Sequence, residues 1–293
     1  MYQYHFGNGF LANSHHYTEF QIRHHNLSPM ILSEIWVYPV KSLGGIRLKE
    51  SLAEERGLQY DRRWLVVDEK GTFLTQRTNA QMALLDVAFS DDGLLISHRY
   101  DPVNQILVPF EREDDVDIEV KIWNDIVSAR TVSNLADEWL SERLGKIVRI
   151  VEMTTGTQRR MNPLYAGTDH TVSFADDFPF LLISQASLDD LNSKLSQSVE
   201  MKRFRPNFVV TGTAPFEEDL WNTITIGDTR FQVTKPCERC VMVNIDPKTG
   251  IKSPETLKML SSYRKEGKEI FFGQNVVGLE SGIVREGDSI TLL

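Results

Sequence analysis

TITIGDTRFQVTKPCERCVMVNIDPKTGIK, residues 223–252, contains two candidate β-hairpins in direct succession. Residues 223–233 alternate apolar and polar side chains on either side of Gly227-Asp228, a pair that favours a tight turn. Residues 241–252 suggest a second hairpin around the turn segment Asp246-Pro247-Lys248-Thr249-Gly250. Hairpins at such close spacing predict antiparallel strands that close into barrels, and they disfavour a parallel sheet.

Short strands and turns continue in both directions from this segment. Two more hairpins are expected, closed at Asp68-Glu69-Lys70-Gly71 and at Asp91-Asp92-Gly93, because each turn places Gly where a positive φ costs little. The expected strand-forming segments of the whole chain are 31–40, 64–74, 84–96, 117–132, 208–210, 223–233, 241–252 and 282–293.

Three helices are expected between the strands, over residues 134–144, from Ser187 onward, and over residues 254–263. Gly145 would end the first helix, and Ser187 would cap the second, with Asp190 at the position of a capping box. The predicted fold class is therefore mixed and mainly β. It comprises a β-rich, barrel-like N-terminal region and a C-terminal β-barrel with a few short helices.

The first thirty residues differ from the rest, because residues 1–30 hold five of the seven histidines and show little apolar periodicity. A metal-binding tail is one interpretation. We expect a poorly ordered extension, because no carboxylate or thiol is regularly spaced with these histidines. A polar stretch near residue 154 suggests a boundary, so the predicted domains are 31–153 and 154–293.

Composition limits the class of partner. The chain has 293 residues and a formal net charge of −9, so nucleic acid is not expected as the main partner. No apolar run is long enough to span a bilayer. The first residues lack the charged-then-apolar layout of a secretory signal. We therefore expect a cytoplasmic protein without a membrane span.

Cys237-Glu238-Arg239-Cys240 is the segment with the most reactive chemistry, and these are the only two cysteines. Two cysteines cannot form a disulfide scaffold or a four-thiolate iron–sulfur cluster. A thioredoxin-like dithiol is disfavoured by the strand predicted after Cys240, and a zinc site by the lack of a second pair. Two interpretations stay open: an inert buried thiol, and a single thiolate ligand to a soft metal whose cofactor brings the other ligands.

Several cationic residues stand at strand ends, where they can bind an anion. Lys41-Ser42 follows a predicted strand and precedes Gly44-Gly45. Arg62 enters another strand, and Arg205 and Asn207 flank Pro206 just before a third. Exposed turns and a surface ion pair of Arg62 remain the alternative interpretations. The acidic cluster 217–219 is expected to be a solvated loop.

These motifs, in this order, resemble one family. From residue 31 to 293 the chain is similar to proteins with a MOSC-associated N-terminal β-barrel region followed by a MOSC domain, such as the mitochondrial amidoxime-reducing components and their bacterial relatives. The motifs that carry the resemblance are Tyr38-Pro39-Val40-Lys41-Ser42, Asp61-Arg62-Arg63-Trp64-Leu65-Val66, Thr75-Gln76-Arg77, Ser187-Leu188, Phe204-Arg205-Pro206-Asn207, Glu217-Glu218-Asp219-Leu220-Trp221, Cys237-Glu238-Arg239-Cys240, Asp246-Pro247-Lys248-Thr249-Gly250 and Phe272-Gly273-Gln274.

The resemblance implies a molybdenum–molybdopterin cofactor. Cys240 would be both the protein ligand to molybdenum and the catalytic residue, with Cys237 as a neighbour only. Ser187 would lie near the cofactor and contact it. The residues that would hold the pterin and its terminal phosphate are Lys41, Ser42, Arg62, Arg205 and Asn207.

The implied activity is reductive removal of oxygen from small N-hydroxylated compounds: amidoximes, hydroxylamines and N-hydroxylated bases. Electrons would come from a separate donor protein of ferredoxin, flavoprotein or cytochrome type, because the two cysteines cannot bind a cluster. Two alternatives remain. One is a carrier of sulfur or of the molybdenum cofactor, with a persulfide on Cys240. The other is a binder of another phosphorylated ligand such as pyridoxal phosphate.

Overall fold

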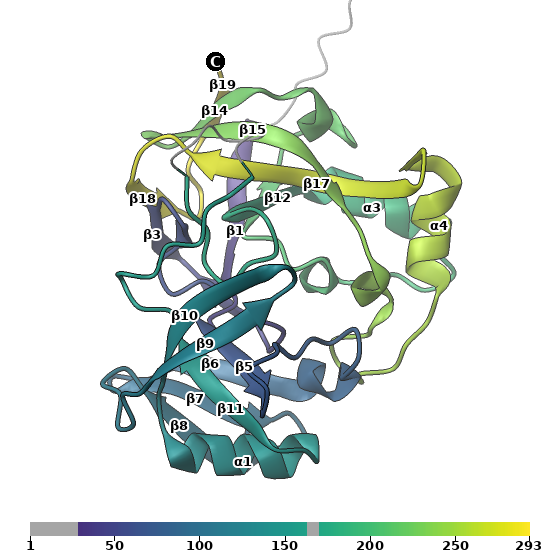
Figure 1. The fold of residues 1–293 in the computed structure, drawn as a ribbon. Helices are drawn as coiled ribbons and strands as arrows, with labels where there is room; N and C mark the ends of the chain where they lie inside the picture. Colours follow the sequence, from purple (N-terminus) through teal and green to yellow (C-terminus); the bar gives the residue numbers. More distant parts are fainter. Residues whose placement is uncertain (1–28, 163–169) are drawn as a thin grey trace, which may run out of the picture.

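The computed structural model describes residues 29–162 and 170–293 and confirms a mixed, mainly β fold (Figure 1). The largest sheet has nine strands. Its strands, in spatial order, are β19 (Ile290–Leu292), β14 (Thr223–Ile226), β15 (Thr229–Glu238), β17 (Glu269–Gly278), β12 (Phe180–Ser184), β13 (Phe208–Thr211), β1 (Ile31–Val37) and β2 (Ile46–Leu48), with β16 (Lys265–Glu266) beside β17.

Three smaller sheets complete the described β structure. The first contains β5 (Trp64–Asp68), β11 (Val148–Glu152), β10 (Asp125–Thr131) and β9 (Asp117–Ile122). The second contains β6 (Leu85–Phe89), β7 (Gly93–His98) and β8 (Asp101–Pro109). The third contains β18 (Gly282–Arg285), β3 (Glu50–Glu54) and β4 (Gly57–Leu58).

N-terminal and C-terminal strands share sheets. β1 pairs antiparallel with β13, and β3 pairs antiparallel with β18. Apolar side chains from both segments fill one core, which includes Leu32, Phe208 and Val284. The predicted domain boundary near residue 154 therefore separates two segments of the chain that still build one sheet together.

The helices cover the ends of the sheets (Figure 1). α1 (Asn134–Leu144) lies beneath β8 and β11, whereas α3 (Gln185–Lys194) and α4 (Glu255–Tyr263) flank one end of β17. α3 connects β12 to β13, and these two strands are parallel, as a helical crossover requires. Four short 3₁₀ turns are also described: η1 (Ala80–Leu84), η2 (Met201–Arg203), η3 (Glu217–Leu220) and η4 (Val241–Asn244).

The first predicted helix is confirmed. Gly145 has a left-handed backbone with φ 65°, and its N–H donates to the carbonyls of Ser141 and Glu142. Gly71 likewise has φ 72°, as its turn predicts. Gly93 does not have a positive φ. Glycine is required there because a side chain would collide with the carbonyl of Val108 on the paired strand.

The start of the second helix is predicted wrongly. α3 begins at Gln185, and Ser184 is its N-cap, with its hydroxyl accepting from the N–H of Ser187 at 3.1 Å. Ser187 is therefore the third residue of the helix and not its cap. Asp190 lies inside the helix, where its side chain pairs with Lys194.

The hairpin expected over residues 241–252 is also wrong in part. Residues Val241–Asn244 form the 3₁₀ turn η4, and only a single bridge, Ile245 to Lys252, joins the two arms. The turn itself is present, since Asp246 Oδ1 accepts from the N–H groups of Lys248 and Thr249. The sequence argued against a thioredoxin-like dithiol because a strand was predicted after Cys240. The structure has a 3₁₀ turn there, so this argument does not hold.

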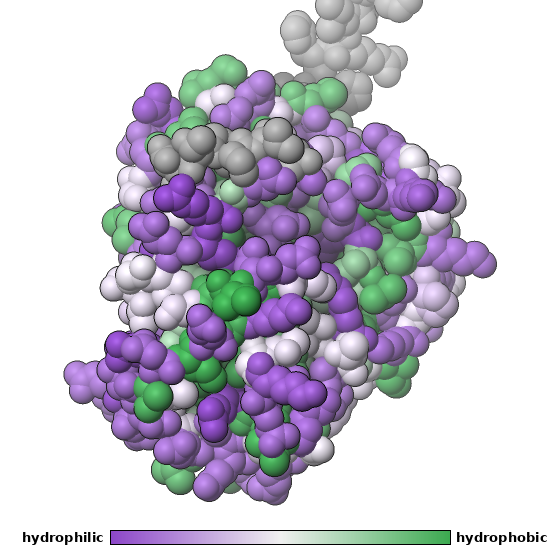
Figure 2. All heavy atoms as spheres, viewed as in Figure 1, coloured by the Kyte–Doolittle hydropathy of each residue, from purple (hydrophilic) through white to green (hydrophobic). Residues whose placement is uncertain are grey.

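The surface seen in Figure 2 is mostly hydrophilic, with apolar residues scattered in small groups. Within the described ranges, no helix is long and apolar enough to cross a membrane. Of the predicted extension, residues 1–30, the part that holds its five histidines, residues 1–28, lies outside the described residues.

Candidate functional site

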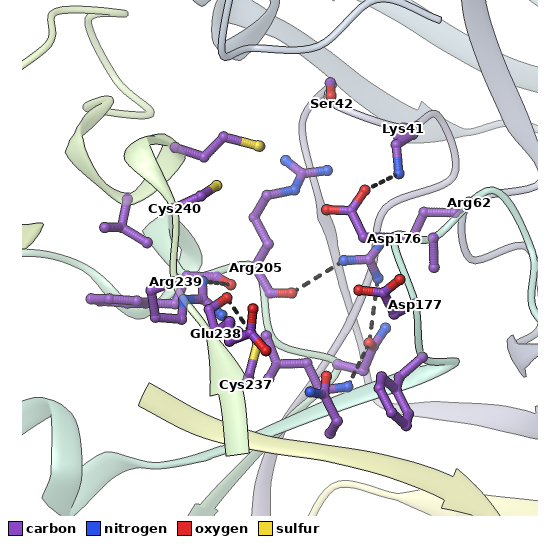
Figure 3. A pocket seen from close by; sticks show the side chains of 18 of the residues that line it. Lys41, Ser42, Arg62, Asp176, Asp177, Arg205, Cys237, Glu238, Arg239 and Cys240 are labelled. Atoms are coloured by element: carbon purple, nitrogen blue, oxygen red, sulfur yellow. Dashed lines mark hydrogen bonds and ion pairs between the residues drawn. The ribbon is translucent and has the colours of Figure 1, made fainter. Parts of the chain in front are cut away.

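A cavity of about 390 Å³ lies among residues from distant parts of the chain. Figure 3 shows Cys237 and Cys240 on one side, Lys41, Asp176 and Arg62 on the other, and Arg205 between them. Five of the six residues predicted to bind a cofactor line this cavity, as does the predicted metal ligand: Lys41, Ser42, Arg62, Arg205, Asn207 and Cys240.

The thiol of Cys240 lies just past the end of β15, where the chain turns into η4. Its Sγ accepts a hydrogen bond from Arg77 Nε at 3.3 Å. Cys237 is also free, and its Sγ contacts Arg239 Nη1 at 3.2 Å. Burial raises the pKa of the Cys237 thiol. The two sulfurs therefore have different cationic partners, and neither belongs to a disulfide.

Three cavity residues were not identified as functional from the sequence. Arg77 stacks its guanidinium on the ring of Trp123 at 4.3 Å, and Trp123 comes from the turn between β9 and β10. Asp176 accepts from Trp123 Nε1 at 3.2 Å and from Arg77 Nη2 at 3.5 Å. Thr75-Gln76-Arg77 was noticed as a motif, but Trp123 and Asp176 lie in loops without any recognisable pattern.

Lys41 is bound between Phe174 and Asp176. Its Nζ donates to the Phe174 carbonyl at 2.7 Å and to Asp176 Oδ1 at 2.6 Å. Burial lowers the pKa of Lys41 to about 8, although the nearby Asp176 opposes this shift. Desolvation by burial favours a higher pKa for Asp176. The positive charges of Lys41 and Arg77 outweigh this effect, so the pKa of Asp176 lies well below its usual range.

Lys41 should make stability depend on pH. Its pKa is about 8 when folded and near 10.5 when unfolded, so unfolding takes up a proton between these values. The free energy of unfolding should therefore rise from pH 8 to pH 10.5, by at most about 1.4 kcal/mol per pH unit. Denaturant unfolding of wild type and Lys41→Met, measured across this range, isolates the contribution. Identical slopes for the two proteins would contradict the assignment.

Arg62 and Arg205 form the far wall of the cavity. Arg62 Nη1 donates to Asn207 Oδ1 at 3.3 Å, and Arg62 Nη2 donates to the Arg205 carbonyl at 3.2 Å. Both guanidinium groups lie over the ring of Tyr38, at 4.4 Å for Arg62 and 4.1 Å for Arg205. Asn207 also holds the backbone, since its Oδ1 accepts from Leu181 N–H at 3.1 Å. The surface ion pair proposed for Arg62 is in fact an interaction with Asp61, which is fully buried.

The cavity fits an anionic ligand. Four arginines that line it each carry a buried N–H without a partner among the described residues: Arg77 Nη1, Arg203 Nε, Arg205 Nη2 and Arg239 Nε. Buried donors without acceptors are costly, so such a cluster indicates a ligand rich in acceptor atoms. Together with the free thiols of Cys237 and Cys240, this donor set suits a phosphorylated cofactor whose metal takes a single thiolate.

Backbone strain is concentrated at the same place. Six non-glycine residues in the described ranges have a positive φ, and four of them line the cavity: Ser42, Arg62, Trp123 and Arg205. Each such conformation costs on the order of 1–3 kcal/mol and persists only where the surroundings enforce it. Strained residues cluster at binding sites, which supports a functional role for this cavity.

Ser187 does not line the cavity. It is fully buried, and its hydroxyl donates to Glu218 Oε1 at 2.8 Å. Glu218 is also fully buried, so the acidic cluster is not a solvated loop. Burial raises the pKa of the Glu218 carboxyl. Ser187 and Glu218 instead hold the start of α3 against η3.

No group of three or more His, Cys, Asp or Glu side chains is positioned to hold a metal ion within residues 29–162 and 170–293. The described side chains thus offer a thiol rather than a complete metal centre. The fold and the cavity together define a class: a mainly β protein with a cationic, strained cavity that two free thiols line.

Comparison with known proteins places this class in a family. Residues 30–147 match the MOSC N-terminal beta barrel domain, and residues 169–291 match the MOSC domain. The mitochondrial amidoxime-reducing component 1 of Mus musculus is 32% identical over 89% of this chain and 82% of its own length. The mitochondrial amidoxime reducing component 2 of Bos taurus is 32% identical over 80% of this chain and 72% of its own length.

A third relative is longer. The molybdenum cofactor sulfurase of Oryza sativa is 30% identical over 91% of this chain, which spans only 34% of that protein. The chain belongs to the family of MOSC-domain proteins with an N-terminal MOSC β-barrel domain, as its motifs predict. The names of these relatives support a function related to the molybdenum cofactor.

Proposed function

We propose that this protein binds a molybdenum–pterin cofactor through Cys240 and reduces N-hydroxylated compounds. The observation that carries the proposal is the presence, on one cavity, of a free thiol beside Arg77 Nη1 and Arg239 Nε, two N–H groups that lack acceptors among the described residues. The names of the amidoxime-reducing relatives supply the substrate class.

Each cavity residue has a part in this proposal. The bound cofactor supplies two-electron redox chemistry and an acceptor for the substrate oxygen. Cys240 provides the protein ligand, and Arg77 orients its sulfur through the Nε–Sγ contact of 3.3 Å. Arg62, Arg205 and Asn207 bind the pterin edge, while Lys41 and Ser42 bind its phosphate. Trp123, 41% exposed, forms the wall along which substrate enters.

The electron donor is proposed to be a separate protein. The chain has only Cys237 and Cys240, and both lie at the cavity, so a cysteine-ligated cluster has no ligands. A surface-exposed Val241 next to Cys240 places the site near the protein exterior, where a partner can approach it.

The proposal is tested with protein purified from a host that makes the cofactor. An aryl amidoxime supplied with a reduced viologen dye should yield the corresponding amidine, and the dye should be oxidised in step with the product. Protein from a host unable to make the pterin should show neither change. A molybdenum-loaded protein that leaves amidoximes, hydroxylamines and N-hydroxylated bases unchanged would refute the reductase proposal.

The match to the sulfurase favours a second candidate, a carrier of sulfur or cofactor. In this case Cys240 would bear a persulfide. Mass spectrometry of the intact protein would show an added sulfur that a reductant removes, and N-hydroxylated substrates would not turn over. An added sulfur on Cys237 alone would contradict the assignment of Cys240 as the residue that bears it.

A further inference from the structure

A second cavity of about 160 Å³ lies on the other side of Arg203 and Arg205, which line both cavities. Its walls include Tyr38, Gly45, Arg99 and Lys202, none of which lines the first cavity. The site is therefore distinct from the proposed cofactor site, although two arginines are common to both.

Three hydrogen-bond donors on this cavity lack partners among the described residues: Tyr38 Oη, Arg203 Nε and Arg205 Nη2. Tyr38 is only 1% exposed, and its ring is fixed between the guanidinium groups of Arg62 and Arg205. Tyr38 lines the second cavity and not the first. An acceptor for its hydroxyl is therefore expected in the second cavity.

The walls of the second cavity are cationic. Three of its four cations already have carboxylate partners: Arg99 pairs with Asp86, Lys202 with Glu200, and Arg203 with Asp246. Arg205 makes no ion pair within the described ranges, and the one described hydrogen bond of its guanidinium goes to the Leu43 carbonyl at 2.7 Å. A buried guanidinium without a counter-charge is costly, so this wall favours an anion over water.

Room for the anion is kept by glycine. A side chain at Gly45 would collide with the ring of Tyr38, so any other residue would displace the donor from its place between the arginines. The rim is open to solutes, since the side chains of Asp86 and Lys202 are 43% and 34% exposed.

We infer that the second cavity binds a free tetrahedral oxyanion of the phosphate or sulfate class, held by the Tyr38 hydroxyl and the Arg205 guanidinium. In this position the oxyanion would hold the Arg205 side chain in place, and Arg205 also lines the first cavity. The inference does not depend on the proposed reductase activity, because Tyr38 lines the second cavity and not the first, whereas Arg203 and Arg205 line both.

The experiment uses full-length protein from a host that cannot make the pterin, so that no cofactor phosphate competes. Titration calorimetry with inorganic phosphate should show binding to wild type at millimolar concentrations. Tyr38→Phe removes one hydroxyl but keeps the ring between the arginines, and should weaken phosphate binding roughly tenfold or more. Equal thermal midpoints without phosphate would show that Tyr38→Phe still folds.

The control is Lys41→Met, which alters the first cavity only. It should leave unchanged the phosphate binding that Tyr38→Phe weakens, and any additional phosphate binding that it removes belongs to the first cavity. Loss of binding in Lys41→Met with none in Tyr38→Phe would place the phosphate in the first cavity and overturn the inference, as would equal losses in both variants or no binding to wild type. Sulfate in place of phosphate should give the same order of affinities among the three proteins.

Discussion

Replacing Cys240 with alanine is expected to reduce the molybdenum content of the purified protein from near-stoichiometric to almost none. Thiolates are strong ligands to soft metals, and the proposed site has one protein ligand, so nothing in the chain replaces a lost Cys240. Metal analysis of protein from a host that makes the cofactor measures the effect. Amidoxime reduction should be lost in parallel.

Cys237→Ala is the matched control for this variant. Cys237 lies on the same cavity, but its sulfur contacts Arg239 instead of Arg77. We expect Cys237→Ala to retain its molybdenum. If Cys240→Ala kept its metal while Cys237→Ala lost it, the assigned ligand would be wrong. If neither variant lost metal, coordination by a cysteine would be refuted.

Replacing Glu218 with alanine is expected to lower the free energy of unfolding by about 3 kcal/mol. Glu218 is fully buried and accepts from Ser187 Oγ at 2.8 and 3.0 Å and from Ser184 N–H at 3.2 Å. Its removal leaves the Ser187 hydroxyl with only the Ser184 hydroxyl as a described acceptor, at 3.3 Å, and removes the acceptor that Glu218 gives to the Ser184 N–H. Denaturant unfolding of the two proteins at neutral pH gives the difference directly.

The neighbouring Glu217→Ala is the control for Glu218→Ala. Glu217 makes one hydrogen bond at the surface, from Ala214 N–H at 2.7 Å, so its loss should cost less than about 1 kcal/mol. Similar losses for the two variants would mean that burial of the Glu218 carboxylate contributes little. Molybdenum content should be unchanged in both, because neither residue lines the cavity.

The local β structure could be predicted because the residues that favour a tight turn lie next to one another in the sequence. Gly71 adopts the left-handed backbone that its turn requires, and β14 and β15 form the hairpin expected around Gly227. Pairings such as β1 with β13 could not be predicted, since the partners are far apart in the sequence and no local signal sets their register.

Errors at the sites had particular causes. Ser184 and Ser187 are both good caps spaced three residues apart, and the sequence does not indicate which one is chosen. Val241 to Asn244 is rich in β-branched residues, yet tertiary packing that buries Val243 overrides this preference. Lys41, Arg62, Arg205 and Cys240 were candidates from their chemistry and their places at strand ends, and the family resemblance decided between a binding role and a structural one. Trp123 and Asp176 acquire their positions only when distant loops meet.

During synthesis, β3 leaves the ribosome long before its partner exists. Ala53 in β3 pairs with Gly282 in β18, so this strand edge stays open while most of the chain is translated. At roughly 5–20 residues per second, the delay is on the order of 10–50 seconds. Unpaired strand edges are aggregation-prone, and such distant pairing slows folding. We therefore expect β3 to complete its sheet only after the last strands of the chain have left the ribosome.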